Sequence, residues 1–290
     1  MPLKKYVFLC KFALKYRSMT IGILYICTGK YGVFWKDFYL TGEKYLFPNL
    51  PKKYFVFSDM SEIYGAESHS NIVSIPVEHR EWPYNTLLRF EMFDQHKALF
   101  ESCDYLLFYN ANSFFTAEIR PEEILPAAEE DYLAALCWKD VICMKTDDYT
   151  YDRNPHSTAY IPFGQGKEYY RGGFIGGRTP EFLQLIKTCR DWTDIDLKNK
   201  IMPLWHDESI LNKYLLDKPV KMLTSAYGKA EEWRNPKHAK MIFRDKEKIF
   251  DVDTFKKTKY TRISVRRFIR KMKRSVKRLF QKTGNPCSSH

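Results

Sequence analysis

The stretch from Asp104 to Phe115 (DYLLFYNANSFF) constrains the fold more than any other part of the chain. Five apolar or aromatic residues, 105–109, are followed abruptly by Asn110-Ala111-Asn112. A short apolar run between polar residues is typical of a strand buried on both faces of a sheet. Ligands usually bind where such strands end in an open α/β sheet. We therefore expect the two asparagines, which share one face of the chain, to project into a crevice. The alternative is a turn capped by both.

Further apolar segments indicate the sheet to which this strand would belong. Four have the length and composition of buried strands, and two have the apolar spacing of helices packed on a sheet. The strands are expected at 20–27, 54–57, 71–77 and 132–137, and the helices at 33–47 and 85–100. Strands that alternate with helices favour a mostly parallel sheet with crossover helices. The sequence therefore predicts an α/β fold with a Rossmann-like sheet.

The composition indicates a folded protein with reduced thiols. Hydrophobic residues make up 44% of the chain and aromatic residues 16%, which excludes wholesale disorder. No stretch approaches the ~20 apolar residues of a membrane-spanning helix, and the apolar residues 7–14 lack the features of a signal peptide. The seven cysteines are odd in number and scattered, without a Cys-X-X-Cys pair. This pattern favours free thiols over a disulfide framework or a zinc site.

The net charge of +12 comes from the C-terminal segment. Residues 254–290 contain thirteen Lys and Arg and no Asp or Glu, so the rest of the chain has 34 basic against 35 acidic residues. Between 262 and 282 apolar residues recur at helical spacing, which predicts a basic amphipathic helix. We expect this helix to bind an anionic membrane surface. Nucleic acid is not expected, because no recognition fold accompanies the helix. A solvated tail is the other alternative.

Three further motifs carry candidate binding chemistry. A glycine-bearing turn at 28–31 follows the first strand, where Rossmann-like folds commonly dock a nucleotide. Two Gly-Gly pairs in 169–177 (YYRGGFIGG) allow a ligand to approach the backbone closely, or form tight turns or bulges. The segment 203–209 (PLWHDES) precedes a leucine-spaced helix. Its acidic pair suits a helix N-terminus or a sugar site beside a stacking tryptophan.

Taken in order along residues 19–250, these motifs resemble glycosyltransferase family 6, which includes the histo-blood-group A and B α1,3-transferases. The resemblance implies the GT-A fold, in which an Asp-X-Asp motif holds a divalent metal against the diphosphate of a nucleotide sugar. Here Asn-Ala-Asn at 110–112 replaces both carboxylates, as in the bacterial branch of the family. The implied reaction is a retaining transfer of galactose or N-acetylgalactosamine from a uridine diphosphate donor to the 3-hydroxyl of a β-galactoside.

The resemblance also implies roles for individual residues. Glu208 would face the anomeric carbon, either as a nucleophile or as an electrostatic partner in a front-face reaction. The residues implied in donor binding are Ile26, Cys27, Thr28, Tyr31, Arg89, Asn110, Ala111, Asn112, Gly172, Gly173, Asp207 and Lys246. The residues implied in acceptor binding are Trp138, Thr150, Trp205, His206 and Glu231.

The missing carboxylates change the chemistry expected at the diphosphate. Asparagine amides bind magnesium or manganese far less well than carboxylates do, but they can donate hydrogen bonds to phosphate or ribose oxygens. Arg89 and Lys246 would then neutralise the leaving diphosphate. We therefore expect no metal ligands, no cofactor, and turnover without a divalent metal.

The expected domain organisation is an N-terminal appendage, 1–18, a GT-A domain, 19–253, and the basic tail, 254–290. Because Gly172-Gly173 leave space for an N-acetyl group, we expect transfer of N-acetylgalactosamine to a β-galactoside, with or without fucose, on a glycan or lipid-linked glycan. The bulky Arg171 keeps UDP-galactose as the alternative donor. A catalytically inactive sugar-nucleotide-binding protein is the alternative from another class. The expected location is the inner face of a bacterial cytoplasmic membrane, in surface polysaccharide synthesis.

Overall fold

A computed structural model describes residues 19–141, 145–233 and 239–256. The chain divides into two compact units, residues 1–245 and 246–290. The described part of the second unit contains a 3-10 turn, η6 (Lys246–Lys248), and a short helix, α8 (Val252–Phe255). Among the described residues, no helix is both long and apolar enough to cross a membrane. The amphipathic helix expected at 262–282 and the appendage 1–18 lie outside the described residues, so the membrane contact and the domain boundaries stay predictions.

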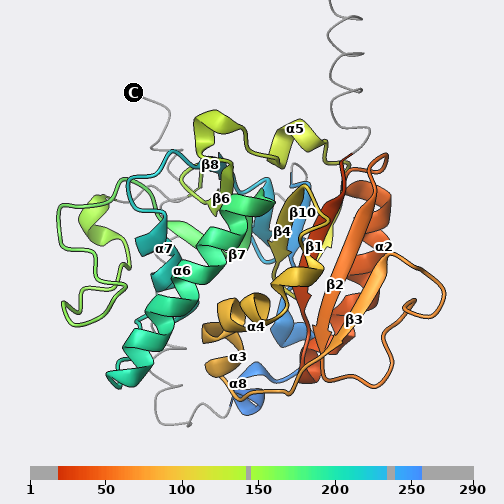
Figure 1. Ribbon diagram of the computed structural model, residues 1–290, viewed down its shortest axis with the longest axis horizontal. Coiled ribbons are helices and arrows are strands. Elements are labelled where there is room, and N and C mark those ends of the chain that lie inside the picture. The colour runs from red at the N-terminus through yellow and green to blue at the C-terminus, as the bar shows by residue number, and fades with distance from the viewer. Residues whose placement is uncertain (1–18, 142–144, 234–238, 257–290) are drawn as a thin grey trace, which may run out of the picture. The chain divides into compact units, whose positions relative to one another are not determined.

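The first unit is built on a seven-stranded sheet with the order β3-β2-β1-β4-β7-β6-β8 (Figure 1). Neighbouring strands from β3 to β4 pair in parallel, and so do β6 and β8, whereas β7 runs against β4 and β6. The predicted mostly parallel α/β sheet is therefore confirmed. The strands are β1 (Ile21–Ile26), β2 (Lys52–Ser58), β3 (Ile72–Pro76), β4 (Tyr105–Tyr109), β6 (Leu133–Cys137), β7 (Tyr170–Arg178) and β8 (Lys221–Leu223).

The central strands are apolar along their whole length because both of their faces are covered. Ile23 of β1 packs in one core with α2 (Trp35–Tyr45), while its neighbour Leu24 packs in a second core with helices from the opposite face. The helices of the second core are α4 (Arg89–Gln95), α6 (Thr179–Lys198) and α7 (Asp207–Tyr214). Figure 1 shows α4 and α6 in front of the sheet.

A smaller sheet follows the Asn-Ala-Asn segment. Its strands, in the order β5-β10-β9, are β5 (Ser113–Phe115), β10 (Met241–Phe243) and β9 (Tyr227–Ala230). β10 is antiparallel to β5 and parallel to β9. Two short elements, α5 (Pro121–Ile124) and η3 (Ala128–Glu130), lead from β5 to β6. A late segment of the chain thus pairs directly with the residues that follow Asn112.

The helix predicted at 85–100 is wrong as one continuous element. It consists of α3 (Tyr84–Leu87), α4 and η2 (Lys97–Leu99), with a break at Leu88, where φ is −95° and ψ is 16°. Asn85 does not cap this helix. Its side chain accepts a hydrogen bond from the Arg80 amide at 2.7 Å and donates to Thr28 Oγ1 at 3.1 Å. The helix predicted at 33–47 is present as α2, after a 3-10 turn, η1 (Gly29–Phe34).

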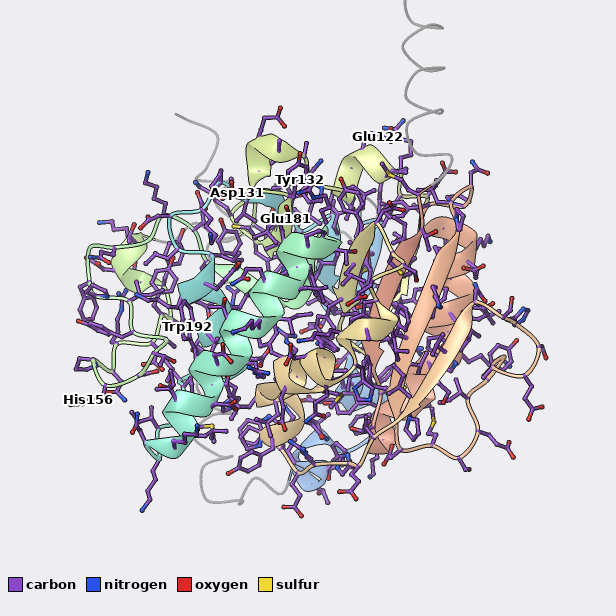
Figure 2. The ribbon with its side chains drawn as sticks, in the orientation of Figure 1. Glu122, Asp131, Tyr132, His156, Glu181 and Trp192 are labelled. Atoms are coloured by element: carbon purple, nitrogen blue, oxygen red, sulfur yellow. The ribbon has the colours of Figure 1, made fainter. Side chains whose placement is uncertain are left out.

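A long irregular segment, 145–169, separates β6 from β7 and contains only the 3-10 turn η4 (Thr146–Asp148). It is tied to α6 through Asp196, which is buried and accepts hydrogen bonds from Ser157 Oγ at 2.6 Å and from the Thr158 amide at 2.7 Å. In Figure 2, His156 marks this loop beside α6, the helix that carries Trp192. These bonds fix the loop that precedes the glycine-rich strand.

Candidate active site

Three of the segments expected to bind a donor meet at one edge of the sheet. β1 and β4 are parallel neighbours with Tyr25 opposite Tyr109, so Ile26 and Asn110 continue from adjacent strand ends. The Asn110 amide donates to the Gly173 carbonyl at 2.9 Å. The Tyr25 hydroxyl donates to the Ala111 carbonyl at 2.7 Å. This is the edge at which open α/β sheets bind ligands.

Glu208 is held at this edge by β7. It lies in the first turn of α7, and its Oε2 accepts a hydrogen bond from the Gly172 amide at 2.6 Å. The other carboxylate oxygen, Oε1, accepts from the Tyr169 hydroxyl at 2.7 Å. Burial, with the charge of Glu208 next in size, raises the pKa of Tyr169 far above its usual value, so this hydroxyl stays a donor. The carboxylate is therefore oriented by two donors.

A buried ion pair lies beside this carboxylate. Arg89 Nη2 is 2.5 Å from Asp207 Oδ2, and both side chains are at most 4% exposed. Arg89 Nη1 also donates to the Gly172 carbonyl at 2.8 Å, and its guanidinium lies over the Phe108 ring at 4.4 Å. Burial raises the pKa of Asp207, and the Arg89 charge opposes that shift. Arg89 thus joins the residues it was expected to join, as a buried residue rather than a solvated helix residue.

The turn into α7 contains a strained residue. His206 has φ 56° and ψ −126°, a conformation that side chains other than glycine rarely adopt. Its ring meets the edge of Trp82 at 5.2 Å, while Trp205 is 47% exposed and its amide donates to Ser209 Oγ at 2.9 Å. Asp152, which is buried, accepts a hydrogen bond from the Leu204 amide at 2.7 Å. The strained turn is therefore fixed from both sides.

The two asparagines have different surroundings. Asn112 is 5% exposed, and its side-chain amide donates to the Arg244 carbonyl at 2.7 Å, while the Arg244 amide donates to the Asn112 carbonyl at 2.8 Å. Asn110 is half-buried and makes its hydrogen bonds with Gly173 and Ser113 through its backbone. Asn112 therefore fastens the chain after β10, a role not expected from the motif. Among the described residues, no group of three or more His, Cys, Asp or Glu side chains could hold a metal ion.

The glycines of β7 make space mainly for protein side chains. A Cβ on Gly173 would lie 2.5 Å from the Phe243 ring. A Cβ on Gly172 would lie 3.3 Å from Glu208 Oε2 and 3.4 Å from Arg89 Nη2. The register between β6 and β7 shifts at this point, from Ala135 opposite Ile175 to Leu136 opposite Arg171. The glycines thus form a bulge that Glu208 and Arg89 approach, as the alternative interpretation of the sequence proposed.

The turn after β1 has polar partners that the sequence did not identify. The buried Thr28 Oγ1 lies 3.2 Å from His79 Nδ1 and 3.1 Å from Asn85 Nδ2. The Gly29 amide donates to Asp59 Oδ1 at 2.8 Å, and Gly29 has a φ of 57°, which favours glycine. Burial raises the pKa of Cys27 to about 12 and, in Tyr31, also to about 12, so both side chains are neutral at physiological pH.

Three of the residues expected to contact an acceptor lie around Tyr169 and the smaller sheet. Trp138 Nε1 donates to the Gly228 carbonyl at 2.9 Å, and its ring meets Trp233 at 4.6 Å. The Thr150 side chain lies at the Tyr169 hydroxyl. Glu231 accepts a hydrogen bond from the Asp245 amide at 2.6 Å. Lys246 begins the second unit, and its position relative to these residues is not described.

Asn212 is a site residue that the roles carried over from the family did not include. Buried in α7, it donates to the carbonyls of Tyr170 and Glu208, each at 2.8 Å, and accepts from the Tyr170 amide at 2.9 Å. An asparagine one helical turn after a candidate catalytic acid is the signal in the sequence. Asn212 thereby ties the helix that carries Glu208 to the strand that orients it.

We expect Asn212→Ala to lower the free energy of unfolding by about 2–4 kcal/mol, because it leaves the buried backbone groups of Tyr170 unpaired. Urea denaturation would measure this loss. Lys213→Ala on the same helix is the matched control and should change stability by less than about 0.5 kcal/mol. Equal stability of the two variants would contradict the role given to Asn212.

Comparison with known proteins identifies the family. The family model described as glycosyltransferase family 6 matches residues 8–252. The O-antigen biosynthesis glycosyltransferase WbnI of Escherichia coli is 36% identical over 232 residues, which cover 79% of this chain and 96% of that protein. The histo-blood group ABO system transferase 1 of Rattus norvegicus is 33% identical over 73% of this chain, and the globoside alpha-1,3-N-acetylgalactosaminyltransferase 1 of Homo sapiens is 26% identical over 78%.

The chain spans less than two thirds of these two mammalian relatives, 62% and 65% of their lengths. The large, mostly parallel sheet flanked by helices agrees with the GT-A fold that the family resemblance implies. The family model covers most of the chain, and the bacterial relative is matched over nearly its whole length. This protein therefore belongs to glycosyltransferase family 6.

Proposed function

We propose that this protein is a retaining α1,3-glycosyltransferase that moves N-acetylgalactosamine from UDP-N-acetylgalactosamine to a β-galactoside without a divalent metal. The observation that carries the proposal is the Glu208 carboxylate, oriented by Tyr169 and Gly172 beside the buried pair of Arg89 and Asp207. The name of the human relative supports the linkage and the sugar. The name of the Escherichia coli relative supports a role in assembling O-antigen, a surface polysaccharide.

The proposed mechanism uses the charge of Glu208. Positive charge develops at the anomeric carbon of the donor sugar as the bond to the diphosphate breaks. A carboxylate held in place by two donors stabilises that charge without reorganising. The same oxygen atoms serve a nucleophile that forms a covalent intermediate and a partner of a front-face ion pair. Asp207, fixed by Arg89, would accept hydrogen bonds from hydroxyls of the donor sugar.

The asparagine motif does not fit a divalent cation. Magnesium and manganese prefer carboxylate oxygens, whereas Asn110 and Asn112 are neutral. The Asn112 nitrogen also points at the Arg244 carbonyl, and its oxygen is buried without a hydrogen-bond partner among the described residues. We therefore route no step through a metal and assign neutralisation of the leaving diphosphate to Arg89 and Lys246.

UDP-galactose is the second candidate donor, and Arg171 is the observation in its favour. This long side chain stands immediately before Gly172, the glycine that borders Glu208. If its guanidinium occupies the space of the N-acetyl group, the smaller sugar fits better.

Release of UDP from each donor, in EDTA and in manganese, tests the proposal. With a panel of free and fucosylated β-galactosides as acceptors, we expect turnover in EDTA within about twofold of the rate in manganese, because neutral amides hold the metal too weakly for it to contribute. The linkage of the product follows from nuclear magnetic resonance. Activity that disappears in EDTA and returns with manganese would overturn metal independence, and donor binding without turnover would favour the inactive sugar-nucleotide-binding protein.

A further inference from the structure

Arg171 is held rigidly by two aromatic rings. Its guanidinium carbon lies 4.7 Å from the centre of the Trp138 ring and 4.8 Å from that of Tyr169. Trp138 is itself fixed by its hydrogen bond to Gly228, and Tyr169 by its hydrogen bond to Glu208. Contact with aromatic faces stabilises a cation and limits its rotamers. The guanidinium is therefore positioned before any ligand arrives.

The charge of Arg171 has no partner among the described residues. Six of the eight described arginines lie within 4.0 Å of a carboxylate: Arg80, Arg89, Arg120, Arg178, Arg190 and Arg244. Arg153 instead donates to two backbone carbonyls. Arg171 has neither kind of contact, although it is half-buried and its Nε is fully buried without a hydrogen bond. A partly desolvated guanidinium without a counter-charge is unfavourable unless a ligand supplies one.

The position of Arg171 connects it to the proposed reaction centre. Tyr169 carries the guanidinium on its ring and donates its hydroxyl to Glu208. The next residue, Gly172, donates its amide to the same carboxylate. Trp138, on the other side, is a residue expected at the acceptor. Arg171 therefore lies between the carboxylate frame and the expected acceptor side.

We propose that Arg171 is a preformed binding site for an oxyanion of a substrate, a carboxylate or a phosphate. The planar fork of a guanidinium matches both groups and binds them through paired, charge-assisted hydrogen bonds. Two sources have this chemistry: an acid group on the acceptor sugar, and the diphosphate of the donor. The inference rests on the proposed function, because that function supplies both substrates.

Equilibrium binding by calorimetry tests this site without requiring turnover. The ligands are UDP against uridine for the donor source, and methyl β-galacturonoside and methyl β-galactoside 6-phosphate against neutral methyl β-galactoside for the acceptor source. We expect Arg171→Gln to weaken the anionic ligands of one source by about 10- to 100-fold, the value of a charge-assisted bond. The neutral ligands should bind as before. Arg171→Lys keeps the charge without the fork and should lie between.

The source of the oxyanion follows from which ligands are weakened. A loss confined to UDP assigns the site to the diphosphate, and a loss confined to the acidic galactosides assigns it to the acceptor. The inference is overturned if Arg171→Gln binds all anionic ligands like the wild type, or if the wild type binds no anionic ligand more tightly than its neutral counterpart. Anion binding that depends on Arg171, in a protein that turns over no UDP-sugar, would support this site while refuting the proposed function.

Discussion

Replacing Glu208 by glutamine should lower kcat by about 10²- to 10³-fold. Glutamine has the same shape, and its carbonyl oxygen can still accept a hydrogen bond from Tyr169 or Gly172, the two donors of the carboxylate. It lacks the negative charge that stabilises the anomeric carbon of the transition state. The KM for the donor should change little, because the charge acts mainly in the transition state. Initial rates of UDP release, with the melting temperature as a check of folding, measure the effect.

The matched control is Glu232→Gln, the same chemical change at an exposed glutamate. It should keep the wild-type kcat within about twofold, because exposed substitutions rarely disturb a fold. If Glu208→Gln retains more than about a tenth of the wild-type rate, the Glu208 carboxylate does not stabilise the transition state, and the proposed mechanism fails.

Replacing Arg89 by methionine should lower the free energy of unfolding by about 3–5 kcal/mol at pH 8, because it leaves Asp207 buried without its ion-pair partner. Activity should fall together with stability, since Arg89 also holds the Gly172 carbonyl at 2.8 Å. Chemical denaturation at pH 8 and pH 5 measures the loss. It should be larger at pH 8 than at pH 5.

The sign of this pH dependence follows from Asp207. Burial already raises its pKa in the folded protein, and the opposing charge of Arg89 is absent from the variant. The folded variant therefore binds the proton of Asp207 more tightly than the unfolded chain does. Stability present below the unfolded pKa, about 3.9, is then lost as the pH rises through the folded pKa.

A double variant, Arg89→Met with Asp207→Asn, distinguishes the ion pair from packing. Removing the buried charge should restore part of the stability at pH 8 and abolish the difference between pH 8 and pH 5. The double variant should stay inactive, because both groups beside Glu208 are gone. A loss of stability that is the same at both pH values and is not reduced in the double variant would mean that Arg89 acts through its volume alone.

The same contrast between local pattern and distant partner runs through the asparagine motif. The apolar run before it is buried on both sides, as its composition requires, and it ends at the ligand-binding edge of the sheet. The equivalence of Asn110 and Asn112, however, holds only in the sequence. Asn112 donates to the Arg244 carbonyl, 132 residues further along the chain. An aspartate there could not donate that bond, which is a structural reason for an amide at this position.

The sequence by itself determined the strands and the adjacent acids. Runs such as 105–109 are apolar throughout, and only a strand covered on both faces buries every residue of such a run. The pair of Asp207 and Glu208 before an apolar helix likewise identified the site from local chemistry, and the ordered motifs indicated the family. These features depend on neighbours in the sequence, so they can be recognised without the fold.

Only the tertiary structure decided which partners these residues have. Arg89 looks like a solvated helix residue until Gly172, 83 residues away, and Asp207 are brought to it. The strand bulge at Gly172-Gly173 has its form because Glu208 and Phe243 pack there from other elements. Arg171 lacks a counter-charge only because of how Trp138 and Tyr169 enclose it. Side-chain partners depend on how distant segments pack, and no local pattern encodes that packing.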